Sequence, residues 1–369
     1  MSSRVTAVTV VTAFALLLVS ACGGSGNNSG SSKTISISFA SADDRIGVFK
    51  TVGDGMVANA AKAGVKVKHY DNKLDGATAL ANADLMIQDH PDIIVDWNAV
   101  ANVGNALGKK FNDAKIPCLA VNQPIAGCDW FNLSNQQAGI DAATTMIPLA
   151  QAKGWTSADT TILMVVQSSA GVEVNNGPRY FYITIAGKIA GFPPKTPDEL
   201  NPQTTVIGNH QGVQYECNST VDGSYANAKN LLPTIPASNH VMVFGDDTDC
   251  TLGALRALTE AGRAANTMAC GLGPTPDGLT NLRTNPSWVC EEALFLEDWP
   301  EFIIAEAVAI HMGIKPPPLT SAPQVSLTKE NVDTYYEGNN VKLLPPLAEN
   351  AQYLKQTGVL QKFGNVQGI

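Results

Sequence analysis

The chain has 369 residues, of which 44% are hydrophobic and 15% are charged, and its formal net charge is -9. Because the sequence is acidic and has no cluster of Lys and Arg, it lacks the surface that binds nucleic-acid phosphates, and we exclude nucleic acid as a partner. A chain of this length is too long for one ordinary core, so we expect two lobes.

The N-terminus has the features of a secretory signal. Arg4 precedes an apolar run over residues 5–19, which is short for a membrane span. Ser20 and Ala21 place small residues where such a signal is cleaved. These features predict a signal peptide over residues 1–21 and a mature chain outside the cytoplasm.

Cys22 is the expected attachment point of a lipid. The junction Val19-Ser20-Ala21-Cys22 resembles the lipobox of bacterial lipoproteins, whose cysteine becomes the acylated first residue. A plain signal peptide followed by an unrelated cysteine is the alternative. Residues 23–32 are almost all Gly, Ser and Asn, and such a segment behaves as a flexible tether. We therefore expect a lipidated tether over residues 22–33 that anchors the protein to the cell membrane.

From residue 34 the chain alternates short β-branched runs with longer amphipathic stretches. Apolar residues at helical spacing, ended by Gly64, predict the first helix. Repeated strand and helix winding of this kind predicts an α/β fold of doubly wound parallel sheets with helices on both faces, and the count fits two lobes. We expect strands over residues 34–39, 65–70, 92–97, 116–122, 161–167, 204–209, 240–245, 267–272 and 288–295, and helices over 48–63, 77–88, 100–114, 136–153, 179–189, 224–232, 251–261 and 299–312.

Six of the seven cysteines remain once Cys22 is set aside. An even number in an exported chain predicts disulfide bonds, although six cysteines allow fifteen pairings. We favour two pairs that are close in sequence and lie at the ends of adjacent predicted strands, and a third by elimination. Because no C-x-x-C spacing occurs, we expect no metal site. The favoured pairs are Cys118 with Cys128, Cys270 with Cys290, and Cys217 with Cys250.

Residues 243–258 read Val-Phe-Gly-Asp-Asp-Thr-Asp-Cys-Thr-Leu-Gly-Ala-Leu-Arg-Ala-Leu. Ser134-Asn135 with Gly139 precede them, and Pro276-Asp277-Gly278 and residues 328–333 follow. In their order these stretches resemble the ribose-binding, or type I sugar-binding, family of periplasmic proteins, and residues 243–258 are similar to that family's strand, polar loop and Leu-Gly-Ala helix. The resemblance implies a hinge of three crossovers that closes on a ligand. It implies discontinuous lobes, 34–134 plus 298–325, and 135–297 plus 326–369 with the C-terminal tail.

The resemblance also implies which residues reach the ligand, at the carboxyl ends of the strands. Asp247 matches an Asn or Asp that faces the ligand, while a helix cap is its alternative and is our preference for Asp249. Trp97 ends a strand and suits either a stacking platform or the core. Asn122-Gln123 replace the Asp-Arg of many relatives, which indicates a ligand rim unlike ribose. The full expected set is Asp43, Phe49, Trp97, Asn122, Gln123, Asn135, Arg179, Asp246, Asp247 and Asp298.

Polar side chains and aromatic rings of this kind suit the hydroxyl rim and C–H faces of a sugar. The resemblance therefore predicts a solute-binding protein that passes a small polar ligand to an ABC transporter permease. The ligand is expected to be a neutral sugar or polyol, with an amino sugar also fitting an acidic cleft. A sensing module that presents its closed form to a membrane receptor or sensor kinase is the alternative. We expect a monomer with no cofactor. We also expect no catalysis, because the five histidines are scattered and no G-x-S-x-G elbow occurs.

Overall fold

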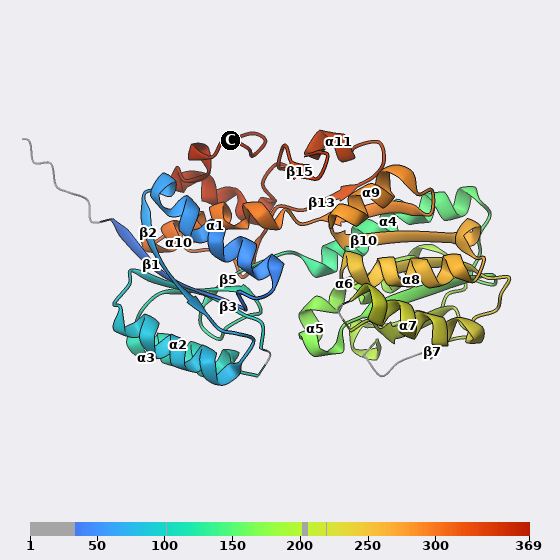
Figure 1. The fold of residues 1–369 in the computed structure, drawn as a ribbon, viewed down its shortest axis with the longest axis horizontal. Coiled ribbons are helices and arrows are strands. Elements are labelled where there is room, and N and C mark those ends of the chain that lie inside the picture. Colours follow the sequence, from blue (N-terminus) through green and yellow to red (C-terminus); the bar gives the residue numbers. More distant parts are fainter. Residues whose placement is uncertain (1–33, 101, 201–205, 219) are drawn as a thin grey trace, which may run out of the picture. The chain divides into compact units, whose positions relative to one another are not determined.

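The computed structural model describes residues 34–369 except 101, 201–205 and 219. The predicted signal peptide, the tether and Cys22 lie outside these residues. Two sheets made mainly of parallel strands organise the described chain, which confirms the expected α/β class (Figure 1). Within the same residues, none of the helices combines the length and the apolar character that a membrane crossing requires.

The first sheet has the strand order β12-β5-β4-β3-β1-β2, and all its recorded pairings are parallel. Both of its faces are buried, because Phe39 and Val95 pack into one hydrophobic cluster and Ala40 and Ile94 into another. Helices α1 and α10 lie side by side on one face, and α2 and α3 cover the other (Figure 1). The elements are β1 (Ile35–Ser41), α1 (Gly47–Ala63), β2 (Val65–Asp71), α2 (Gly76–Gln88), β3 (Ile93–Asn98), α3 (Gly104–Ala114), β4 (Cys118–Asn122), β5 (Asp129–Asn132), α10 (Trp299–His311) and β12 (Thr320–Ser321).

The second sheet has the order β13-β11-β10-β9-β6-β8-β7, with antiparallel strands only at its two edges. Helices α4 and α6 pack so closely that a Cβ atom at Gly139 would collide with the carbonyl oxygen of Gly177. Helices α7 and α8 pair in the same way. The elements are α4 (Asn135–Ala152), β6 (Thr160–Val166), α6 (Asn176–Lys188), β7 (Val206–Ile207), β8 (Gly212–Glu216), α7 (Val221–Leu231), β9 (His240–Gly245), α8 (Thr248–Glu260), β10 (Thr267–Gly273), α9 (Pro276–Thr284), β11 (Trp288–Ala293) and β13 (Val325–Leu327).

The chain passes between the two sheets three times: from β5 into α4, from β11 into α10, and from β12 to β13. These are the three crossovers that the family resemblance implied. The six described cysteines form the favoured bonds, Cys118 with Cys128, Cys217 with Cys250, and Cys270 with Cys290. The second of these bonds joins the end of β8 to the first turn of α8, next to the polar loop that follows β9.

Several elements differ from the prediction, and the short strands β5, β12 and β13 were not expected. Of the described residues in the strand expected over 204–209, only the short edge strand β7 forms, and the sheet is continued by β8. The sequence pattern did not indicate β8 as a strand, because Gln214 interrupts its apolar residues, although Gln214 is buried in the fold. Helix α9 (Pro276–Thr284), which begins at a proline, was also missed. Proline is favoured at the first helical position, where its missing N–H is not needed.

The C-terminal tail, grouped with the second lobe from the sequence, contacts elements of both sheets. Arg283 of α9 forms an ion pair with Asp333. Further on, the tail packs against α10 through the 3-10 segment Glu349–Thr357. The hydroxyls of Tyr353 and Thr320 lie 2.7 Å apart, and Lys362 Nζ donates to the carbonyl oxygen of Ala63 at 2.6 Å. The tail therefore bridges the two halves.

Several carboxyls are fully buried in this fold. Glu306 accepts a hydrogen bond of 2.8 Å from the hydroxyl of Thr320, and Glu291 accepts one of 2.8 Å from Nε1 of Trp288. Burial raises the pKa of both glutamates to about 8. It also raises the pKa of Asp96, which accepts a hydrogen bond of 3.0 Å from the amide of Asn72, to about 7.

We predict that these three carboxyls make stability fall as pH rises. In the unfolded chain they ionise near pH ~4, whereas in the fold they stay protonated until about pH 7 to 8. Their contribution is therefore complete below pH ~4 and is lost as pH rises through the folded pKa values. Calorimetry should show a Tm that declines between about pH 5 and pH 8, and a shallower decline for Glu306→Gln. The exposed control Asp54→Asn should keep the wild-type slope, and an unchanged slope for Glu306→Gln would contradict the prediction.

Candidate ligand-binding site

The polar loop after β9 places Asp246 and Asp247 at the carboxyl edge of the second sheet. Asp247 has extended backbone dihedrals and caps α8, accepting a hydrogen bond of 2.6 Å from the backbone N–H of Cys250. The preference for Asp249 as the cap was wrong, because α8 begins at Thr248, three residues earlier than expected. The cap engages one carboxylate oxygen of Asp247 and does not exclude a ligand at the other.

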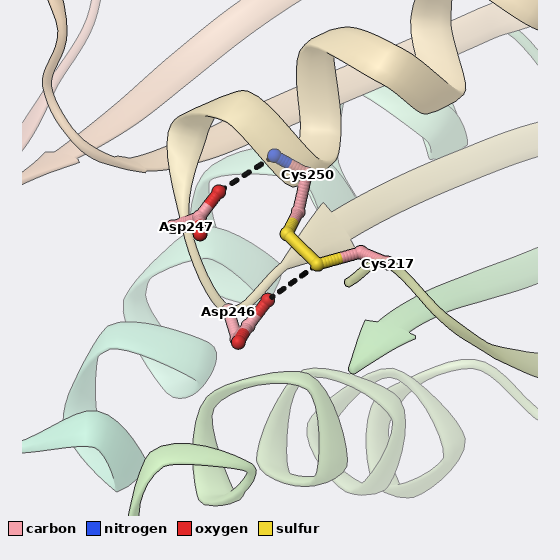
Figure 2. Close-up of side chains that lie close together, drawn as sticks. All are labelled: Cys217, Asp246, Asp247 and Cys250. Carbon is pink, nitrogen blue, oxygen red and sulfur yellow. Dashed lines mark hydrogen bonds between the residues drawn. A yellow bond between two sulfur atoms is a disulfide. The ribbon is translucent and has the colours of Figure 1, made fainter. Parts of the chain in front are cut away.

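Asp246 and Asp247 lie beside the disulfide of Cys217 and Cys250 (Figure 2). The sulfur atoms and one oxygen from each carboxyl all lie within 4.8 Å of one another. One oxygen of Asp246 is 3.6 Å from Cys217 Sγ, which carries no proton because it is in the disulfide. Burial and the charge of Asp247 raise the pKa of Asp246 well above its usual range, and burial raises that of Asp247 to about 6.

Two clusters in the described chain combine cysteines with carboxylates as metal sites do: this one, and Cys270 and Cys290 with Glu292. In both clusters the sulfurs are joined in a disulfide, so they offer no thiolate to a metal. The first cluster is left with two carboxylates and the second with one. Neither set approaches the four ligands of a structural zinc site.

The loop after β6 is shaped by Asn175, whose side chain is 1% exposed. Its amide accepts a hydrogen bond of 2.9 Å from the N–H of Gln167 and donates to the carbonyl oxygens of Gln167 and Gly171, both at 2.7 Å. These bonds hold a 3-10 turn, Ser168–Ala170, and the short helix α5 (Gly171–Val174) between β6 and α6. We call residues 168–174 the bridging segment.

The bridging segment contacts polar residues at the strand ends of the first sheet. Gln123 Nε2 donates to the carbonyl oxygen of Ala170 at 2.9 Å. The half-buried carboxylate of Glu173 accepts from the amides of Asn132 at 3.5 Å and Asn135 at 3.4 Å. Asn176 of α6 donates to the other oxygen of Glu173 at 3.3 Å. Glu173 is thus surrounded by three amides from both halves of the chain.

Three expected site residues meet at this place. Asn135 and Gln123 contact the bridging segment directly, and Asn122 Nδ2 donates to Asn132 Oδ1 at 3.4 Å. The sequence analysis missed Glu173, although its place in a loop after a strand was a usable signal. The expected set contains Arg179, in the helix that follows, instead of Glu173.

At the first sheet, Asp43 is hydrogen-bonded by a neighbouring residue, and Trp97 is buried in the core. Asp43 is buried and accepts from Arg45 Nε at 2.9 Å, and this hydrogen bonding holds its pKa at about 2. Trp97 is 3% exposed, packs edge-to-face with Phe49 at 4.9 Å between ring centroids, and stacks on Trp299 at 5.7 Å. This burial matches the core alternative for Trp97.

Arg179 and Asp298 are not joined to the other expected residues by any contact recorded in the described chain. Arg179 is 5% exposed, burial lowers its pKa, and its Nε has no hydrogen-bond partner among the described residues. Asp298 accepts from Asn365 of the C-terminal tail at 2.8 Å, and burial raises its pKa to about 6. The polar residues that the structure does gather are those around Glu173 and around Asp247.

The sequence profile of the periplasmic binding protein domain family matches residues 36–287. No curated protein matches the sequence. Many solved structures share this fold. Their sequence identity with this chain is low, so the similarity establishes the fold and not the function. They include an ABC transporter solute-binding protein from Mycobacterium smegmatis with bound glycerol (TM-score 0.66, 15% identity, 84% of this chain and 99% of that one), a periplasmic ribose ABC transporter protein from Conexibacter woesei (0.64, 15%, 82% and 94%), and a solute-binding protein from Actinobacillus succinogenes with bound D-allose (0.64, 13%, 82% and 100%).

We predict that Asn175→Ala loosens the bridging segment. The substitution removes three buried hydrogen bonds, so the free energy of unfolding should fall by about 1–3 kcal/mol. Urea denaturation measures that loss, and limited proteolysis should find new cleavage within residues 168–174. The exposed control Gln137→Ala on α4 should change stability by less than about 0.5 kcal/mol and show no new cleavage. Equal protease resistance of Asn175→Ala and wild type would refute the role given to Asn175.

Proposed function

Because the chain belongs to the periplasmic binding protein domain family, we propose that it is an extracytoplasmic solute-binding lipoprotein that delivers a sugar or polyol to an ABC transporter permease. The observation that carries this proposal is the meeting of Glu173 with Asn132 and Asn135. It brings hydrogen-bonding groups from both halves of a hinged chain to one place. A ligand that replaces those contacts would favour the closed arrangement of the two halves.

The chemistry around Glu173 suits a ligand rich in hydroxyl groups. Amides both donate and accept hydrogen bonds, and a carboxylate accepts charge-assisted ones, which together match hydroxyls that do both. The contacts of Glu173 with the three asparagines are all 3.3 Å or longer. Contacts of this length are exchanged for ligand hydroxyls at small cost, because the bonds lost are weak. The solved relatives that hold glycerol or D-allose support the same class of ligand.

Export and anchoring complete the proposal. The signal peptide over residues 1–21 and the lipobox at Cys22 would place the folded domain outside the membrane on a lipidated tether. A solute-binding protein held there would meet both its ligand and a permease. Neither catalysis nor a cofactor forms part of the proposed role, so the ligand should be released chemically unchanged.

We predict that sugars or polyols raise the Tm of the mature chain in a concentration-dependent way, because a ligand that binds only the folded state stabilises it. A thermal-shift screen over pentoses, hexoses, polyols, amino sugars and sugar phosphates measures this. Sugar phosphates should give no shift, since carboxylates outnumber cations around the gathered residues. Chromatography of the recovered ligand should show it unaltered. Stabilisation by sugar phosphates or apolar molecules alone would contradict the proposed function.

We also predict that Cys22→Ser releases the protein from the membrane. The serine hydroxyl is a poor acceptor for the acyl-transfer chemistry that a cysteine thiol undergoes, so the variant should lack lipid. In producing cells, wild type should fractionate with membranes and take up a clickable fatty-acid label, whereas Cys22→Ser should do neither. Ser25→Ala in the tether is the matched control and should behave as wild type. A labelled, membrane-bound Cys22→Ser would end the lipoprotein assignment.

A further inference from the structure

The C-terminal tail passes between the two halves a fourth time, in addition to the three crossovers. Its first part is attached to the second half, where Asp333 forms an ion pair of 3.0 Å with Arg283 of α9. The hairpin of β14 (Tyr336–Glu337) and β15 (Asn340–Val341) follows. Residues 343–369, which we call the terminal segment, then pack against α10 of the first half (Figure 1). A connection that is attached at both ends limits how far two hinged halves can separate.

The terminal segment is attached to the first half by apolar and polar contacts together. Leu354 is fully buried, and the ammonium of Lys62 in α1 lies 4.5 Å from the ring centroid of Phe363. Asn365 Nδ2 donates a hydrogen bond of 2.8 Å to Asp298, the residue directly before α10. The polar end of the terminal segment therefore lies at the start of that helix.

Glu301, in the first turn of α10, is the buried acid at this attachment. It is 7% exposed, and its Oε2 has no hydrogen-bond partner among the described residues. The same is true of Oδ2 of Asp298 and Oδ1 of Asn365, and a hydrogen bond from Asn365 also acts on Glu301. Three buried acceptor oxygens thus lack a donor at one place. A proton on Glu301 would provide an O–H donor, which an ionised carboxylate does not have.

The charges around Glu301 favour its protonated form. Burial and the charge of Asp298 raise the pKa of Glu301 to about 7, and the opposing charge of Lys62 does not cancel this shift. Burial and the charge of Glu297 raise the pKa of Asp298 to about 6. Tyr336 of β14 also faces these carboxyls, and burial with their charges raises its pKa, so its phenol stays neutral. No group that acts on Glu301 within the described chain therefore outweighs its burial.

We propose that the terminal segment is a proton-dependent strap, which is docked on the first half while Glu301 holds a proton and which limits how far the two halves open. When the terminal segment detaches, water reaches Glu301 and Asp298, and both ionise near pH ~4 as free carboxyls do. Docking therefore takes up protons, so it is strongest below pH ~4 and weakens as the pH rises through about 6 to 7. The strap acts without a solute, so the proposal goes beyond the proposed function.

Hydrogen exchange of the mature chain, without solute, measures how firmly the terminal segment is docked. After correction for the intrinsic effect of pH on amide exchange, its protection relative to β6 should fall by about tenfold or more between about pH 5 and about pH 8. Glu301→Gln cannot ionise and keeps a donor where the protonated acid has one, so its protection should change little. The control Glu349→Gln removes an exposed carboxyl from the same segment and should keep the wild-type fall.

Asn365→Asp tests whether the docked segment restrains the halves. The substitution places a third carboxyl of nearly the same shape beside Asp298 and Glu301, so the segment should detach at about pH 8 through like-charge repulsion. Small-angle scattering should then give a larger radius of gyration than for wild type. At about pH 5 protonation should restore the wild-type radius, which distinguishes detachment from misfolding.

Each outcome decides one part of the proposal. Protection that does not fall at the higher pH, or that falls equally in Glu301→Gln and wild type, overturns the proton-dependent docking. A terminal segment that loses protection in Asn365→Asp while the radius of gyration stays unchanged overturns the strap. Because none of these measurements includes a solute, their failure leaves the proposed function in place. A thermal-shift screen in which no sugar or polyol binds overturns the proposed function and leaves the strap in place.

Discussion

The hydrogen bond that Glu173 accepts from Asn132 connects the bridging segment to the end of β5 in the first sheet, and the proposed ligand capture depends on it. Neither half can supply this contact alone, because the carboxylate lies in the second half of the chain and the Asn132 amide in the first, while Asn135 belongs to α4 of the second half. Asn175 makes the contact possible, since its three bonds fix the path of the bridging segment. A loop without these bonds would sample many conformations, and Glu173 would face the opposite half in only a few of them.

Two kinds of buried carboxyl occur in this fold, and their surroundings explain the difference. Asp43 has a guanidinium beside it, so it stays ionised with a pKa of about 2. The hydrogen bonds to Glu306 and Asp96 within the described chain come from neutral groups, so burial dominates and their pKa values rise. The first kind holds a loop through charge, while the second is tolerated as a neutral acid. Asp246 resembles the second kind in burial, and Asp247, which is partly exposed, lies next to it at the edge of the second sheet.

The sequence predicted those features that depend on local spacing. Apolar residues at helical spacing located α1, and cysteines at neighbouring strand ends gave the pairing of Cys118 with Cys128. Features that depend on distant partners were missed or misplaced. Glu173 acquires its role from Asn132, 41 residues away, and β8 is a core strand although Gln214 interrupts its pattern. Asp298 was expected at the ligand, but it accepts a hydrogen bond from Asn365 of the tail. A local sequence pattern cannot predict a partner that is so distant along the chain.

The cap at α8 explains how Asp247 can serve both the fold and a ligand. One of its oxygens is fixed by the N–H of Cys250, and Cys250 is itself tied through the disulfide to the end of β8. The carboxylate is therefore held in place before any ligand arrives, so binding does not require it to lose rotational freedom. A flexible carboxylate would gain the same contacts but would first have to be ordered. Under the proposed function, rigidity that originates in helix capping becomes preorganisation for the ligand, because the strand, the disulfide and the helix start all meet at one loop.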